Sequence, residues 1–580
     1  MKLIWKYMKP YLGTISWGMT LKFLGTLGEL SLPYILEHII DTIVPLGKLR
    51  PVVLWGLLMI VMALLTRQLN IGANRTAASV ARRSIYHLRD DLFRKTVNLS
   101  GSRFDAFSLP SLTSRMTSDS YNVQAFMLRI QTLGIRAPIM LLGGIFVTLT
   151  MDVALAGILC IMVPLLIFVV FFITLKGVPL YTRVQNRMDD VVRIMRENII
   201  GIRVVKALSK EPHEIRRYEQ ANDDLMKDDI HAGVIMAIPG PFMQLCLNVG
   251  LTLVVYVGAL RVNGGQTEPG VILAFLTYFN LILQAVMALN RVFVMYSKAK
   301  ASADRIGIVL EDLPDQEVIP WTADVKTSAT KASELSHIRF DHVSFRYGDD
   351  AEDSLTDIHF SLDHGNSLGI IGATGCGKTT VINLLMRFYD AREGRVLIDG
   401  RDVRSFPKDD LHRKFGVVFQ NDIIFADTLF NNIDFGRNLA KEDVERAAAD
   451  AQAAGFIGEL AEGYDHPAAI KGANLSGGQK QRVMIARALA AKPEILILDD
   501  ASSALDYQTD AKLRTTLRQN YKDITTIMIA QRISSVMHLD QIMVMEEGKI
   551  LDMGTHEELL ERCDLYRTIY RSQMGSVTNV

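Results

Sequence analysis

The chain has 580 residues, and its 63 lysines and arginines balance 63 aspartates and glutamates, so its charge argues against a protein that binds nucleic acid through phosphates. Its length leaves room for several domains. The four cysteines lie far apart without metal-ligand spacing, which excludes both a disulfide framework and a cysteine zinc site.

Long apolar runs are concentrated before about residue 300, although hydrophobic residues make up 49% of the whole chain. The plainest run, 153–175, is uncharged and long enough to cross a hydrocarbon core of roughly 30 Å as a helix. Polar residues interrupt the other candidates. Together the runs predict a membrane domain with six spans, at about 14–44, 52–72, 130–150, 153–175, 234–262 and 270–296.

Basic residues mark the two long connections that follow the second and the fourth span. The positive-inside rule places both connections in the cytoplasm, and an even number of crossings then puts both chain termini there. Helical periodicity predicts that the spans continue beyond the bilayer as stalks. Their turning points, near 108–118 and 203–217, are candidate coupling segments, with ordinary solvated helix as the alternative interpretation.

Charged residues inside the predicted spans are costly unless they face a cavity or one another. This applies to Lys22, Glu29, Arg67 and Arg136, which therefore indicate a water-accessible pathway. Aromatic and methionine residues of the sixth span either form an adaptable binding surface or pack against lipid and neighbouring helices. They are Phe275, Tyr278, Phe279, Met287, Phe293 and Met295.

The second half of the chain has the pattern of a soluble domain. A charged, proline-containing stretch leads into alternating apolar residues from about residue 337. We therefore divide the chain into a transmembrane domain at 1–310 with two cytoplasmic coupling segments, a linker at 311–336 and a nucleotide-binding domain at 337–580.

A phosphate-binding loop follows the short apolar strand 367–371. Residues 372–380 fit the pattern GxxxxGK[ST] and lead into an apolar helix. Glycines let backbone N–H groups surround the phosphates, Lys378 reaches the β and γ phosphates, and the Thr379 hydroxyl can bind Mg²⁺. Strand, loop and helix in this order predict a nucleotide-binding site.

Two further segments extend this interpretation. The apolar strand 495–498 ends at Asp499, where a carboxylate can hold the water shell of a metal ion. About twenty residues earlier, the segment 475–479 precedes a helix and offers Ser476 and backbone N–H groups to an anion. Since Lys378 and the metal already serve this domain's own phosphates, the second anion site is best explained as a cap for a second copy of the domain.

These motifs together resemble those of ABC exporter half-transporters, over essentially the whole chain. The resemblance implies an α-helical transmembrane bundle of six long helices with cytoplasmic extensions, followed by an α/β P-loop NTPase domain of ABC type that uses ATP and Mg²⁺. It assigns Mg²⁺ to Thr379, Gln420 and Asp499. It implies that nucleotide contacts come from Tyr347, Gly372, Thr374, Gly375, Cys376, Gly377, Lys378, Thr379, Thr380, Ser476, Gly477, Gly478, Gln479 and Asp506.

The resemblance assigns three residues to catalytic positions. Gln420 matches the Q-loop residue of the family, whereas the other two positions depart from the family pattern. Asp500 stands where the family usually has a glutamate that polarises the attacking water, and its shorter side chain displaces the carboxylate by roughly 1 Å, which can cost about 100-fold. Gln531 replaces the switch histidine and cannot carry its positive charge. Ile470 replaces a glutamate expected ahead of the signature, so communication across the dimer is expected to be asymmetric.

The resemblance implies ATP-driven export of an amphiphilic, drug-like or lipid-like cargo across the cell membrane. The altered Walker site and intact signature favour a heterodimer with a second half-transporter that supplies the catalytic glutamate and histidine. The alternatives are a homodimer that tolerates both substitutions, a peptide exporter, and a regulatory ATP-binding subunit with little turnover. An importer fits poorly, because importers of this superfamily usually carry these domains on separate chains.

Overall fold

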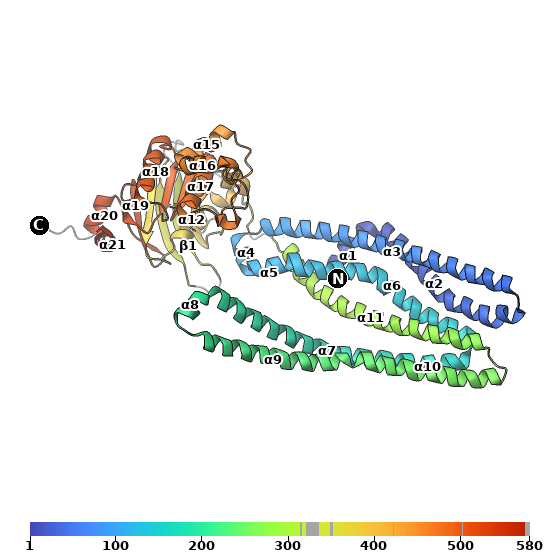
Figure 1. Ribbon diagram of the computed structural model, residues 1–580. Helices are drawn as coiled ribbons and strands as arrows, with labels where there is room; N and C mark the ends of the chain where they lie inside the picture. The colour runs from blue at the N-terminus through green and yellow to red at the C-terminus, as the bar shows by residue number, and fades with distance from the viewer. Residues whose placement is uncertain (314–315, 321–335, 349–351, 421–422, 502, 575–580) are drawn as a thin grey trace. The chain divides into compact units, whose positions relative to one another are not determined.

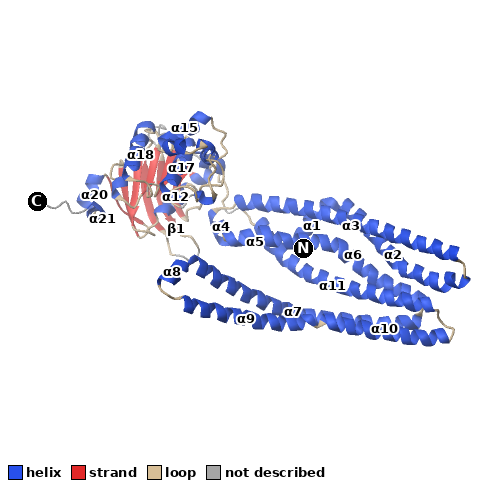
Figure 2. Cartoon of the chain, in the orientation of Figure 1, coloured by secondary structure: helices blue, strands red, loops and turns tan. Residues whose placement is uncertain are grey.

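The computed structural model describes residues 1–313, 316–320, 336–348, 352–420, 423–501 and 503–574. These residues form two compact units, the first made of 1–98 with 109–312 and the second of 99–108 with 313–580. Figure 2 shows the first unit as helices, whereas the described strands lie in the second. Most of the predicted linker, including 321–335, lies outside the described residues.

Long helices connected by short turns build the first unit (Figure 1). The long ones are α2 (Leu12–His38), α3 (Leu49–Val97), α6 (Ser120–Met151), α7 (Val153–Ile200), α9 (Glu211–Ala237), α10 (Pro239–Asn263) and α11 (Pro269–Leu310). Short ones are α1 (Lys2–Met8), α5 (Leu109–Ser114) and α8 (Ile202–Ala207), with π-helical turns at Ile39–Ile43 and Arg115–Asp119.

Five helical stretches are long and apolar enough to cross a membrane among the described residues. They contain the second to sixth predicted spans, so the expectation of a multi-span membrane domain is confirmed. The first predicted span corresponds to α2 and the π-turn that follows it, and α2 does not meet the same apolar criterion. A crossing by α2, and with it the count of six, stays a prediction.

The stalks continue well beyond a bilayer, as predicted. Helix α3 has 49 residues and α7 has 48, which corresponds to about 70 Å each. The second turn, α8, falls at the predicted position. The connection from α3 to α6 includes the predicted first turn at 108–118 but begins earlier, at α4 (Gly101–Phe107), where Ser100 caps the helix by accepting a hydrogen bond from the Arg103 amide at 3.3 Å.

Helix α4 belongs to the second unit. Its first amide, at Gly101, donates to the Phe388 carbonyl at 3.1 Å, and the Tyr389 hydroxyl donates to Asp105 at 2.5 Å. A Cβ at Gly101 would lie 2.8 Å from that carbonyl and 2.9 Å from the Tyr389 ring, so this contact requires glycine. Since α4 connects α3 to α5 along the chain, it is a physical link between the stalks and the second unit.

Three aromatic residues of the sixth predicted span lie in the helical core, whereas Phe293 is exposed. Phe275, Tyr278 and Phe279 are buried, and the Tyr278 hydroxyl donates to the Leu30 carbonyl at 2.6 Å. Helix α11 also bonds the turn before α6, where buried Asp119 accepts hydrogen bonds from Ser302 and Arg305. Of the two alternatives for these three aromatic residues, packing against neighbouring helices is the one observed.

Two sheets organise the second unit. The larger has the strand order β10-β9-β3-β8-β7-β6, with β10 antiparallel to β9 and the other pairs parallel; the smaller is antiparallel, in the order β2-β1-β4-β5. The strands are β1 (Ile338–Phe345), β2 (Leu355–Leu362), β3 (Ser367–Gly372), β4 (Glu393–Ile398), β5 (Arg401–Asp402), β6 (Phe415–Val418), β7 (Ile495–Asp499), β8 (Thr525–Ile529), β9 (Gln541–Glu546) and β10 (Lys549–Gly554).

The parallel strands are apolar on both faces because both faces are covered. Along β7, Leu496 and Leu498 belong to one hydrophobic cluster, while Ile495 and Ile497 belong to the other. The helices of this unit besides α4 are α12 (Lys378–Leu385), α13 (Lys408–Arg413), α14 (Leu429–Asp434), α15 (Lys441–Asp450), α16 (Ala454–Glu459), α17 (Gly477–Ala490), α18 (Tyr507–Asn520), α19 (Ile533–Val536), α20 (His556–Arg562) and α21 (Asp564–Met574). The α/β fold expected for this half is therefore confirmed.

Candidate nucleotide-binding site

The carboxyl ends of β3, β7 and β8 meet at one edge of the parallel sheet. Ile370 pairs with Ile529, and Asp499 also pairs with Ile529, so the three strands end in register. Ligands of open α/β sheets bind at this edge. The loop after β3, the carboxylate that ends β7 and the residues after β8 are thereby brought together.

The loop after β3 has the conformation that its glycines permit. Gly375 and Gly377 have φ angles of 86° and 97°, which an L side chain rarely adopts. A Cβ at Gly377 would also lie 2.9 Å from the Ser354 carbonyl. The Lys378 ammonium lies over the loop, donating to the carbonyls of Gly372 at 2.9 Å and Ala373 at 2.7 Å. This loop leads into α12, and Thr374, Gly375 and Gly377 line the pocket, where backbone N–H groups can bind phosphate.

Three oxygen-bearing side chains form the candidate metal site. The Thr379 hydroxyl donates to the Asp499 carboxylate at 2.9 Å, and Gln420 lines the same pocket after β6. Hydroxyl, carboxylate and amide oxygens are ligands that suit Mg²⁺, so these residues fit that ion. Burial raises the pKa of Asp499, against the opposing effects of the Thr379 hydrogen bond and of Lys378.

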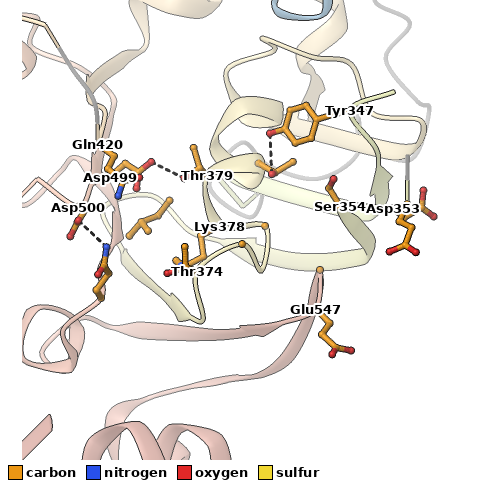
Figure 3. A pocket seen from close by; sticks show the side chains of 17 residues that line it. Tyr347, Asp353, Ser354, Thr374, Lys378, Thr379, Gln420, Asp499, Asp500 and Glu547 are labelled. Atoms are coloured by element: carbon orange, nitrogen blue, oxygen red, sulfur yellow. Dashed lines mark hydrogen bonds between the residues drawn. The ribbon is translucent and has the colours of Figure 1, made fainter. Parts of the chain in front are cut away.

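The two substituted residues are hydrogen-bonded to each other. The Gln531 amide nitrogen donates to the Asp500 carboxylate at 3.1 Å, and both residues line the pocket (Figure 3). The Asp500 backbone, with φ of 53°, is held by its own N–H, which donates to the Ile529 carbonyl at 3.0 Å. Burial raises the pKa of the Asp500 carboxyl, while Arg532 and Lys378 act in the opposite direction.

These groups surround a pocket of about 830 Å³ that opens beside Tyr347. Tyr347 is 47% exposed, and its hydroxyl lies 3.1 Å from the Thr380 hydroxyl, which leaves a ring face available for stacking on a base (Figure 3). The sequence did not reveal several other lining residues, because they come from loops without a motif. These are Glu352, Asp353, Ser354, Glu547 and Gly548; Ile529, at the end of β8, also lines the pocket and belongs to no motif.

The predicted signature segment does not line this pocket. Ser476 caps α17 in a capping box: its hydroxyl accepts from the Gln479 amide at 3.3 Å, and its own amide donates to the Gln479 side chain at 2.8 Å. Asp506 caps α18 and is likewise absent from the lining, and hydrogen bonds from Thr509 lower the pKa of its carboxyl. Nor do Gly372 and buried Cys376 line the pocket, although both belong to the phosphate loop.

Comparison with known proteins separates the chain into the same helical and α/β regions. A family profile described as the ABC transporter transmembrane region matches residues 15–286, and a second, described as ABC transporter, matches residues 355–503. The uncharacterized ABC transporter ATP-binding protein YfiB of Bacillus subtilis is 36% identical over 571 residues, covering 98% of each chain. YknU of the same species is 32% identical over 573 residues, 98% of this chain and 97% of its own.

Some relatives have a more specific name. The ATP-dependent lipid A-core flippase of Syntrophus aciditrophicus is 33% identical over 495 residues, which cover 85% of this chain and 81% of the flippase. Among solved structures, a bacterial Atm1-family ABC exporter with ATP bound superposes with a TM-score of 0.81. It covers 96% of this chain and 98% of its own at 24% identity, and it supports the fold alone.

Proposed function

The chain belongs to the ABC transporter family as an exporter half-transporter, a multi-pass membrane domain fused to one cytoplasmic nucleotide-binding domain, and on this premise we propose that it works as the impaired-site subunit of a heterodimer. Membership implies ATP-driven export. The proposed complex pairs this chain with a second half-transporter that carries the catalytic glutamate and switch histidine.

The hydrogen bond between Gln531 and Asp500 is the observation that carries this proposal. It joins the two positions on which hydrolysis depends in this family. One needs a carboxylate that polarises the attacking water, and the other needs a side chain that can carry a positive charge. A glutamine that donates to the carboxylate occupies one of its acceptor sites and brings no positive charge. This pair is suited to retaining ATP and poorly suited to cleaving it.

The other half of the argument is the start of α17. The Ser476–Gln479 capping box orders the helix terminus, whose remaining backbone N–H groups can bind an anion. In the proposed complex these groups cap the γ-phosphate held by the partner's Walker motifs. This chain then contributes an intact half to the partner's site and an altered half to its own.

The cycle then follows from this chain's own residues. Lys378 and the loop amides bind the phosphates, Tyr347 stacks on the base, and Thr379, Gln420 and Asp499 hold the ion. Mg²⁺, when bound, neutralises charge on the transferring phosphate. ATP binding closes the paired domains, and α4 and α8 carry that movement to the stalks. Hydrolysis in the partner's site resets the complex.

The proposed class of cargo is supported by a relative of this chain and not by its nucleotide-binding site. An amphiphilic, drug-like or lipid-like molecule is the cargo class we propose, supported by the 33% identity to a protein named as a lipid A-core flippase. A peptide cargo is the alternative. A regulatory subunit that binds ATP without driving transport is a second candidate function, favoured by the same Gln531–Asp500 pair.

Purification from native membranes in mild detergent tests the proposal. The chain is tagged at its C-terminus, and intact-mass analysis identifies what copurifies at equal stoichiometry. We expect a second half-transporter with glutamate and histidine at the two positions, and ATP-driven movement of an amphiphile by the pair. Recovery of this chain alone as an active homodimer would contradict the heterodimer, and an intact pair that moves no cargo would favour the regulatory subunit.

A further inference from the structure

A polar network joins three helices in the interior of the first unit. The Lys22 ammonium donates to Asn70 at 2.7 Å, Asn70 donates to Glu29 at 3.1 Å, and Arg136 donates to Glu29 at 2.9 Å. Asn74 accepts a longer bond from Lys22, at 3.4 Å. The network therefore joins α2, α3 and α6, and its charged members all lie within predicted spans.

The charges in this network do not cancel. Lys22 and Arg136 each carry one positive charge and Glu29 one negative charge, which leaves an excess of one positive charge. Glu29 forms an ion pair with Arg136, so the neighbours that bond Lys22 are neutral amides. Lys22 is only 5% exposed. Burying this ammonium is costly because Glu29, the carboxylate that attracts it, is also paired with Arg136, and a further anion would relieve that cost.

The helices around the network add further positive charge. Helix α6 contains Arg129 and Arg136 and no acidic residue, and the part of α11 before Asp304 likewise contains Arg291 but no acidic residue. Arg129 lies two turns from Arg136 and Arg291 two turns from Gln284, so each pair shares a helix face. Both Arg129 and Arg291 are exposed.

The two helix faces meet at one point. Arg136 and Gln284 together line a small pocket of about 20 Å³ between α6 and α11. That volume has room for about one water molecule, so a larger group would lie across its opening. Arg136 and Gln284 are therefore the two polar donors at this pocket, whose other lining residues are apolar, and Glu29 and Asn70 connect Arg136 to the buried Lys22, which does not line it.

A purely structural role would explain the Glu29–Arg136 pair and the Asn70 bridge, because these hold the three helices together. It does not explain why a lysine is buried there, since an apolar side chain would pack at lower cost. Nor does it explain the absence of acidic residues along α6 and the adjoining part of α11. The excess positive charge is the feature that calls for a ligand.

We propose that this network binds the acidic head group, a phosphate or a carboxylate, of the exported amphiphile. The inference rests on the proposed export function and restricts its cargo to anionic molecules. The Lys22 ammonium and the Arg136 guanidinium supply the counter-charge, Gln284 adds a hydrogen-bond donor, and Glu29 orients Arg136. Cationic amphiphiles are disfavoured at the same place.

Matched probes test this in the purified complex, reconstituted in nanodiscs of zwitterionic lipid. The probes share one alkyl chain and carry a phosphate, a phosphocholine or a trimethylammonium head group. We expect the alkyl phosphate to bind about tenfold more tightly than the trimethylammonium probe. A fluorescent phosphatidic acid, compared with the single-chain probe, distinguishes a bilayer lipid from a free amphiphile as the source of the acid.

Two variants change the network in opposite directions. Lys22→Met removes the excess charge and should bring the phosphate-to-ammonium preference close to one. Glu29→Gln doubles the excess and should increase that preference, although it breaks an ion pair. General damage to the bundle would lower the binding of all probes in both variants, so opposite changes in preference identify charge as the cause.

Arg75→Gln is the matched control, because Arg75 is exposed on α3, two residues beyond buried Ala73 and hence on the opposite side of that helix. The complex with Arg75→Gln should have the same phosphate-to-ammonium preference as the native complex. Equal binding of all three probes, or tightest binding of the cation, would overturn the inference. ATP-driven movement without head-group preference contradicts this inference alone, whereas absence of movement for every probe contradicts the export function.

Discussion

The pocket at the ends of β3, β7 and β8 and the start of α17 are two proposed anion sites in one domain, and they differ in which family residues they retain. The pocket has the phosphate loop, Lys378 and the metal carboxylate, but its two hydrolytic positions hold Asp500 and Gln531. The start of α17 keeps Ser476 and its capping box unaltered. Binding chemistry is thus present at both sites, whereas cleavage chemistry is altered at one.

This difference matters because the two sites serve different nucleotides in the proposed pair. Substitutions that impair hydrolysis in the pocket affect the ATP bound by this chain. The α17 terminus acts on the ATP bound by the partner. A single chain can therefore be a poor ATPase in its own pocket and still be indispensable for turnover by the complex.

The largest expected effect is that of Gly477→Asp. A carboxylate at the start of α17 would repel the partner-bound γ-phosphate, and we expect the ATPase rate of the purified complex to fall about 100-fold or more. Lys378→Ala, which weakens only this chain's own pocket, should lower that rate by a few-fold at most, by the same measure.

Gly477→Ala is the control for size, because a Cβ there would lie 3.3 Å from the Ala504 Cβ. It should lose far less activity than the aspartate. Equal loss of ATPase activity in Gly477→Asp and Lys378→Ala would show that both sites contribute equally to turnover, which would contradict the proposed difference between them.

Restoring the family residues should reduce the difference in hydrolysis rate between this chain's pocket and the partner's. Asp500→Glu combined with Gln531→His returns the longer carboxylate and a residue that can carry charge, and we expect turnover in this chain's pocket to rise about tenfold. The rise is measured as single-turnover hydrolysis with the partner's catalytic glutamate changed to glutamine. No rise would place the cause of slow hydrolysis outside these two residues.

Base stacking is expected to contribute a similar or smaller effect, on binding rather than on cleavage. Tyr347→Leu removes the ring and should weaken ATP binding to this chain about tenfold, measured by nucleotide photolabelling. Tyr347→Phe keeps the ring and loses only the hydroxyl contacts, to the Thr380 hydroxyl at 3.1 Å and from the Asn383 amide nitrogen at 3.2 Å, so it should bind ATP within about twofold of the native chain. If both variants bind equally weakly, the hydroxyl and not the ring face is what the site uses.

The smallest effect concerns pH. Mg²⁺ binds the ionised carboxylate, and burial raises the pKa of Asp499, so this residue takes up its proton at a higher pH than an exposed aspartate does. The Mg²⁺-dependent gain in ATP affinity should therefore decline by about a few-fold as the pH falls from 7 toward 5. Asp499→Asn should show neither the gain nor its pH dependence. A gain that stays constant down to pH 4 would contradict this assignment.

Much of the fold could be predicted from sequence because its signals are local. Apolar length indicates a span, and the glycines of 372–380 specify a phosphate loop wherever they follow a strand. Lys22, Glu29 and Arg136 were expected to face one another or a cavity, and Glu29 and Arg136 do form an ion pair. Exposed Arg67 is not part of that network among the contacts described.

What sequence could not supply depends on tertiary contacts. Glu352 and Glu547 reach the pocket from loops whose residues form no motif. The hydrogen bond between Asp500 and Gln531 exists because β7 and β8 are adjacent, although the two residues are 31 positions apart. The predicted first turn at 108–118 did not include α4, because α4 is one short helix whose local signal is the serine cap at Ser100.

The most direct test of the account is the fate of the nucleotide held by each chain. The purified pair is allowed one turnover with azido-ATP labelled on either the α or the γ phosphate, photolysed, and separated into its chains. The account predicts that this chain keeps both labels, as uncleaved ATP, while the partner keeps only the α label. Equal loss of the γ label from both chains would contradict the claim that this chain's own pocket is hydrolytically impaired.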